Sequence, residues 1–137
     1  MAALSAARLT KSRSLGRKVS YLMKASTQIW SGSMVMINDA GTCEPAGVDS
    51  SNSGICGVAT TSVLSTSAGE RITVQEGIFL FGGDSLAQTC VGEIAHADDD
   101  QTVDETAASN TARAGIFVEF VSSSSAWVDI SLANASA

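Results

Sequence analysis

Short apolar runs separated by small polar turns form the main pattern along the chain. In "GERITVQEGIFLF" (69–81), Ile72 and Val74 alternate with polar residues, and an unbroken apolar run follows Gly77. Alternation with a period of two predicts a half-buried strand, and a short apolar run between turns predicts a buried one. A glycine inside such a pattern indicates a bulge or a close backbone approach. We therefore expect one long strand here that bends at Gly77.

Residues 115–133 carry the clearest strand pair. The segments "GIFVEFV" and "AWVDISLA" are separated by four serines, and two strand patterns joined by a short polar turn predict a β-hairpin. Simple alternation places Phe117 and Val121 on one face of the first strand, with Val118 and Phe120 on the other.

The remaining pattern favours an all-β fold, either a small single-domain β-barrel or a sandwich. Further strands are expected within 18–23, 29–37, 55–63 and 93–97, with a short helical turn or a loop at 86–91. Residues 98–113 are polar and predict a long exposed loop into which Val103 is tucked. The total of roughly seven to nine short strands is typical of sandwiches and barrels.

Charge divides the chain into two parts. Residues 1–24 contain no acid and carry a charge of +6, whereas residues 25–137 hold two cations and all fourteen acids, a net charge of −12. This asymmetry predicts a basic N-terminal arm over 1–24, attached to an acidic all-β domain over 25–137. The cations of the arm are Arg8, Lys11, Arg13, Arg17, Lys18 and Lys24.

The arm has several possible partners. Nucleic acid is less expected, because the acidic domain would repel it and only Tyr21 is available to stack on bases. A membrane surface is not expected, because the arm has few bulky apolar residues and the chain has no run of about 18 apolar residues. A mitochondrial presequence and a solvated tail are further readings. We expect a protein partner, either an acidic neighbour or a second copy of the chain.

The acidic run Asp98, Asp99 and Asp100 has three readings. The first reading is an ordinary solvated loop. The second is a calcium site, although the consecutive acids do not follow the spacing of an EF-hand calcium loop. A third reading makes it the receptor for the basic arm of a neighbouring copy.

Motifs for catalysis or cofactor binding are missing from the sequence. It contains no phosphate-binding glycine motif and no HExxH, and His96 is the only histidine. Cys43, Cys56 and Cys90 form no paired motif and are expected to be buried, reduced side chains. We expect no enzymatic activity, cofactor or metal, although fourteen acids leave a hydrolase or a sugar-binding domain formally open. Trp30 and Trp127 are expected to be core or interface anchors.

The segments "GERITVQEGIFLF", "DDDQTV" and "AGIFVEFVSSSSAWVDISL" resemble the C-terminal half of small decoration, or cement, proteins of tailed-bacteriophage capsids. The resemblance covers about residues 54–132. It implies a non-enzymatic all-β protein on the outside of the virion. Such proteins usually form homotrimers at three-fold positions, where they clamp adjacent major capsid subunits. The long arm and the three cysteines are not part of this pattern.

The sequence therefore predicts a structural virion protein that binds the outside of a phage head and stabilises contacts between major capsid subunits. Arg8, Lys11, Arg13, Arg17 and Lys18 are the expected contacts. Lys24, Trp30 and the acidic run at 98–100 are further candidates. The alternative is a nucleic-acid-binding module that acts through the basic arm.

Overall fold

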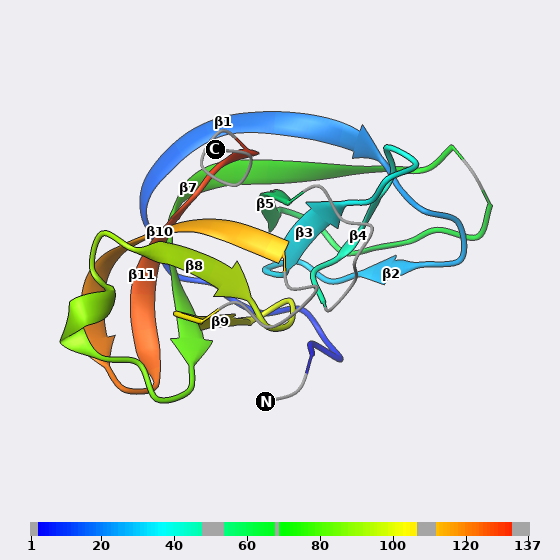
Figure 1. Ribbon diagram of the computed structural model, residues 1–137. Coiled ribbons are helices and arrows are strands. Elements are labelled where there is room, and N and C mark those ends of the chain that lie inside the picture. The colour runs from blue at the N-terminus through cyan, green and yellow to red at the C-terminus, as the bar shows by residue number, and fades with distance from the viewer. Residues whose placement is uncertain (1–2, 48–53, 68, 107–111, 133–137) are drawn as a thin grey trace.

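Strand β7 (Arg71–Gly83) organises the fold, because four other strands pair with it: β1, β5, β9 and β11. The computed structural model describes residues 3–47, 54–67, 69–106 and 112–132 (Figure 1). Strands dominate it, so the predicted all-β fold is confirmed. Of the helical turn and the loop that were both expected at 86–91, the structure has the turn, the 3-10 helix η1 (Gln88–Cys90). No helix among the described residues is long and apolar enough to cross a membrane.

The other strands are short except for β1 and β10. Their bounds are β1 Ser12–Leu22, β2 Gln28–Ile29, β3 Met34–Ile37, β4 Cys43–Pro45, β5 Ile55–Ala59, β6 Val63–Leu64, β8 Ile94–Ala97, β9 Thr102–Asp104, β10 Ala112–Ser122 and β11 Ser125–Ile130. Strands β2 and β6 form a separate two-stranded sheet, and all the others belong to one large sheet.

Part of the large sheet closes on itself. The order β11-β10-β8-β9-β7 is completed by the pairing of β11 with β7, so these five strands form a small barrel. From β7 the sheet continues through β5 and β3 to β4, away from the barrel (Figure 1). Of the two expected architectures, the barrel is the closer description of this half of the molecule.

The barrel interior is narrow, and its composition reflects this. Its buried side chains include Phe81 and Phe117 together with many alanines. The buried alanines of these strands are Ala95, Ala97, Ala112, Ala114 and Ala126. Small and large residues together fill the tapering interior of a small barrel, which explains why alanine is frequent at these buried positions.

Strands β3 and β5 are buried on both faces. Met34 and Met36 face the barrel-side core, whereas Val35 between them belongs to a second cluster that includes Met23 and Ile72. A strand covered on both sides reads as a continuous apolar run instead of an alternating one, as in the sequence "MVMI". The described residues therefore form two hydrophobic clusters that share these strands.

The predicted hairpin is confirmed, but its predicted faces are wrong. Strands β10 and β11 pair in antiparallel orientation, with register shifts between Phe117 and Glu119 and between Phe120 and Ser122. Each shift inserts one extra residue in β10, Val118 or Val121, and a bulged residue breaks simple alternation. Phe117 is therefore buried, whereas Val121 is half exposed.

The expected irregularity at Gly77 is present, although the extra residue lies in the neighbouring strand. Strand β7 runs through Gly77 without a break, and the register of β1 against it shifts between Leu15 and Lys18. A Cβ atom at position 77 would overlap the carbonyl oxygen of Ser14. Glycine is needed here because two backbones approach closely.

Candidate interaction surface

Residues 3–11, which we call the arm segment, lie against the body of the same chain. The backbone N–H of Arg8 donates to the carbonyl of Ser31 at 2.7 Å, and the N–H of Leu4 donates to Oδ1 of Asp100 at 2.8 Å. The Thr10 hydroxyl donates to the carbonyl of Gly32 at 2.7 Å. Gly32 is required at this place, because a Cβ atom there would overlap the carbonyl oxygen of Arg8.

The Arg8 side chain is held on an aromatic ring. Its guanidinium carbon lies 5.1 Å from the centroid of the Phe81 ring, and one of its N–H groups donates to the carbonyl of Leu80 at 3.4 Å. Burial lowers the pKa of Arg8, and the nearby Asp100 carboxylate opposes this effect. This cation–π contact was not anticipated, because nothing in the sequence pairs position 8 with position 81.

The acidic run is not a uniformly solvated loop. Asp100 is 2% exposed and accepts the Leu4 N–H, whereas Asp98 is exposed. Burial raises the pKa of Asp100, and the Leu4 hydrogen bond opposes that rise. Asp99 is half-buried and accepts the backbone N–H of Gln101 at 2.9 Å. The expected long exposed loop is also interrupted by strand β9, in which Val103 is buried as predicted.

Strand β1 carries the next cations, and it is part of the large sheet. Arg13 forms an ion pair with Glu119 at 2.6 Å, and its guanidinium carbon lies 4.3 Å from the centroid of the Trp127 ring. Arg17 pairs with Glu76 at 2.9 Å. Residues 12–22 are thus built into the β fold, and the expected boundary after residue 24 does not coincide with the start of the sheet.

The remaining cations of the arm differ in whether they form ion pairs. Lys24 lies 3.9 Å from Glu44. Lys11 and Lys18 are exposed, and among the described residues no ion pair engages either amino group. These two lysines are therefore the exposed arm cations whose amino groups carry no ion pair among the described residues.

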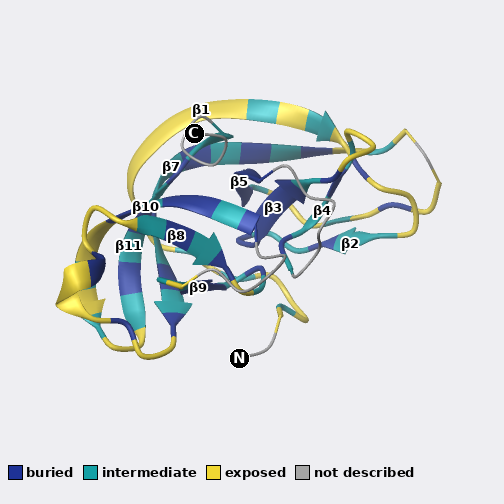
Figure 2. Ribbon diagram, viewed as in Figure 1, coloured by how far each residue is buried: buried dark blue, intermediate teal, exposed yellow. Residues whose placement is uncertain are grey.

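One edge of β1 carries no strand among the described residues. The other edge pairs with β7 over almost the whole length of β1, and Figure 2 shows β1 exposed along most of its course. Leu15 and Leu22 are 58% and 43% exposed. An exposed edge presents unpaired N–H and C=O groups, and charged side chains on it discourage pairing with the wrong strand. The opposite end of the large sheet, β4, is only three residues long and ends at Pro45.

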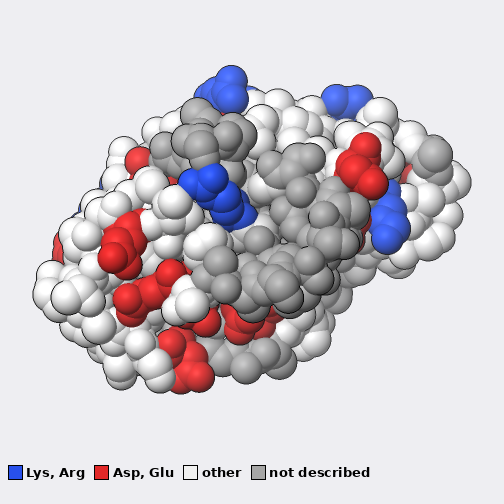
Figure 3. Space-filling model, in the orientation of Figure 1, with Lys and Arg blue, Asp and Glu red and all other residues white. Residues whose placement is uncertain are grey.

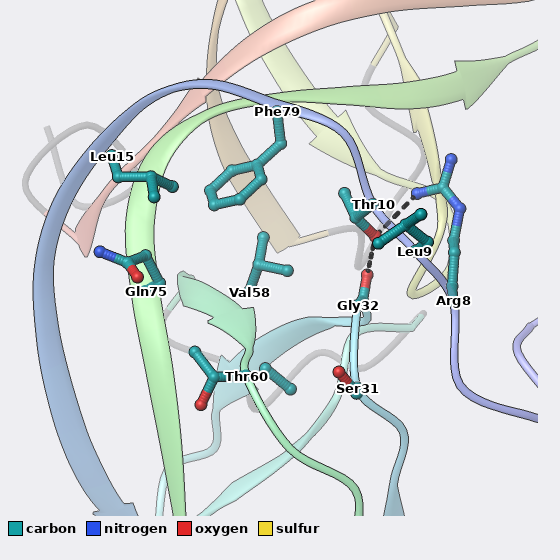
Figure 4. A pocket seen from close by; sticks show the side chains of 11 residues that line it. Arg8, Leu9, Thr10, Leu15, Ser31, Gly32, Val58, Thr60, Gln75 and Phe79 are labelled. Carbon is teal, nitrogen blue, oxygen red and sulfur yellow. Dashed lines mark hydrogen bonds between the residues drawn. The ribbon is translucent and has the colours of Figure 1, made fainter.

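Two hollows flank these elements. An apolar hollow of about 160 Å³ lies between the arm segment and strands β5 and β7, and Val58 and Phe79 line it (Figure 4). An acidic hollow of about 440 Å³ is lined by Asp84, Asp98, Asp104 and Glu105. Figure 3 shows acidic side chains gathered over the part of the surface that carries β8 and β9, and basic side chains on the upper rim, where β1 runs.

The other candidate residues do not come together. Cys43, Cys56 and Cys90 are buried free thiols, as expected, and the Sγ atoms of the first two lie 3.9 Å apart. Burial lowers the pKa of His96, which is half-buried on β8. Within the described ranges, no three His, Cys, Asp or Glu side chains are grouped to hold a metal ion. Trp30 and Trp127 are both partly exposed, and Arg13 stacks on the ring of Trp127.

A comparison with models of known protein families finds no match, and a comparison with curated proteins finds no similar sequence.

Proposed function

We propose that this chain is a non-enzymatic capsid decoration protein, which binds the outside of a phage head and stabilises contacts between major capsid subunits. The observation that carries the proposal is the long exposed edge of β1, which lies beside an acidic body. It is supported by the resemblance of residues 54–132 to decoration proteins.

The edge of β1 has the properties of a docking strand. A partner segment in extended conformation could add to it through backbone hydrogen bonds, with side chains supplying specificity. Lys11 and Lys18 would attract acidic groups on that segment, and Leu15 and Leu22 would bury apolar surface against it. We therefore propose an acidic, extended segment of a capsid subunit as the partner of this edge.

Because the contact is repeated over a lattice, each single contact can be weak and the shell is still stabilised. Many copies bound side by side on a shell gain from multivalency, so a modest affinity per copy still stabilises the assembly. Binding to the folded state also stabilises the decoration domain by mass action. This mechanism is mechanical and needs no reactive side chain.

The proposal is tested by co-sedimentation with emptied phage heads. Deleting residues 1–24 would be uninformative, because it removes strand β1 from the sheet. The charge reversals Lys11→Glu and Lys18→Glu keep the strand and alter only exposed side chains. Lys24→Glu lies beyond β1 and reverses one charge, half the change of the double variant, so it is the control for each single reversal.

We expect the Lys11→Glu/Lys18→Glu variant to bind heads about ten-fold or more weakly and Lys24→Glu to bind within about two-fold of the wild type. No binding by the wild-type protein would refute the proposal. Salt-sensitive binding to free DNA, with none to heads, would favour the nucleic-acid-binding alternative.

A further inference from the structure

The residues of the body that contact the arm segment, which we call the seat, fit the sequence of that segment. Asp100 accepts the Leu4 amide, Phe81 carries the Arg8 guanidinium, and Gly32 leaves room for the Arg8 carbonyl. Every one of these seat groups comes from residues 31–100 of the body. Any second copy of this chain therefore presents the same seat.

The arm segment is only loosely integrated into its own domain. It is held mainly by backbone and polar contacts: of its two leucines, Leu4 is only half-buried and Leu9 is 95% exposed. The apolar hollow beneath Leu9 and Thr10 is not filled by either of them. An arm that bridged two copies would lie at their junction, where the neighbour could cover Leu9 and Leu15.

Charge and reach also favour a second copy as the partner. The arm segment carries two cations, Arg8 and Lys11, and no acid, whereas residues 12–137 hold six cations and fourteen acids, a net charge of −8, so the arm segment of one copy is attracted to the body of another. The arm segment leaves the sheet at Lys11, whose carbonyl accepts the Leu80 N–H at 2.9 Å. Eight extended residues beyond that point span about 26 Å, which is enough to reach an adjacent molecule.

We infer that the arm segment of one copy seats on the body of a second copy, so that neighbouring molecules exchange arms. Exchange of an identical element between protomers costs little, because each interaction that is broken within one molecule is formed again between the two. The high local concentration of copies in any oligomer or on any shell would then favour it. This inference needs only two copies of the chain and does not depend on a capsid.

The test is cross-linking, in the absence of phage heads, between two variants that each carry one added surface cysteine. Ala7→Cys places a thiol on the exposed arm segment, and Ser31→Cys places one at the seat. A short bismaleimide joins them only when arm and seat meet. The native cysteines are all 0% exposed, so they do not react in the folded protein. Thr89→Cys, on η1, replaces Ser31→Cys in the control for random collision.

We expect a mixture of the Ala7→Cys and Ser31→Cys proteins to give covalent heterodimer at least five-fold above the control mixture. The double variant, with both thiols in one chain, should give linked dimers and larger species in addition to internal links. Circular dichroism verifies that each variant is folded. The inference is overturned if the mixture stays at the control level while the double variant forms only internal links. Because heads are absent, that failure would leave the decoration proposal untouched.

Discussion

Asp100 and Arg8, two oppositely charged residues that are far apart in the sequence, attract each other where the arm segment meets the body. Asp100 is almost fully buried, and Arg8 lies half-buried over Phe81. Removing charges from water is costly unless they are paired or hydrogen-bonded. The Leu4 N–H and the attraction of Arg8 offset part of that cost for Asp100. The arm segment is thereby attached to the body at Asp100, a carboxyl group whose protonation affects the stability of the fold.

The stability of the protein should depend on pH through Asp100. Its pKa in the folded state is raised above the ordinary value of 3.8, so above that pH the folded state holds this proton more tightly than the unfolded state does. The contribution of Asp100 to the free energy of unfolding therefore falls as the pH rises from the pKa of the unfolded state to the higher pKa of the folded state. Urea denaturation between pH 4 and 8 should show wild type losing stability relative to Asp100→Asn. If the free energy of unfolding of wild type, relative to that of Asp100→Asn, stayed constant or increased with pH, this prediction would be contradicted.

Arg13 is expected to stabilise the sheet through Trp127. We expect a double-mutant cycle of Arg13→Ala and Trp127→Ala to give a coupling energy of about 0.5–1 kcal/mol, as for exposed cation–π pairs. Lys18→Ala, on the same strand but without an ion pair in the structure, should change the free energy of unfolding by less than about 0.5 kcal/mol. Zero coupling between Arg13 and Trp127 would show that the stacked geometry contributes nothing.

At the scale of elements, the β10–β11 hairpin depends on one residue without a side chain. Gly115 pairs with Ile130, and a Cβ atom there would overlap the carbonyl oxygen of Asp129. We expect Gly115→Ala to lower the free energy of unfolding by about 3 kcal/mol, because the strands must separate to admit the methyl group. Gly47→Ala is the control, since among the described residues no atom beyond its chain neighbours lies within 4 Å of the place that its methyl group would take. Equal stability of the two variants in urea would be inconsistent with this packing.

The sequence pattern predicted elements well where one strand has one buried face. The hairpin at 115–133 and the long strand before residue 83 follow from alternation and turn residues. It failed at Val118 and Val121, because a bulge depends on the partner strand and leaves no mark in local periodicity. It also missed β1 before residue 18, where both faces are exposed and no apolar alternation exists to be read.

At the scale of the whole molecule, the separation of charge along the chain becomes a separation in space. The basic strand β1 lies at one edge of the sheet, and the acidic hollow lies near β8 and β9 at the barrel (Figures 1 and 3). Repeated copies with such polarity can attract one another and an acidic partner at the same time. Both proposals for this chain use that arrangement.

The candidate site was predictable only in part. Net charge identified Arg8, Arg13 and Arg17 as a group, but all three contact acidic or aromatic groups of their own chain. Their partners Phe81, Glu119 and Glu76 are 59 to 106 residues away in sequence. Such pairings are set by the topology of the sheet, which a single sequence does not reveal. Lys11 and Lys18, which carry no ion pair among the described residues, could be distinguished from the other arm cations only once those contacts were known.

The central claim is that the exposed edge of β1 binds an acidic protein partner on a phage head. The most direct measurement is the affinity of Lys11→Glu/Lys18→Glu for emptied heads, compared with wild type and Lys24→Glu at equal ionic strength. We expect binding by wild type and by the control, and a loss of about ten-fold or more in the double variant. Equal binding by all three proteins would contradict the claim.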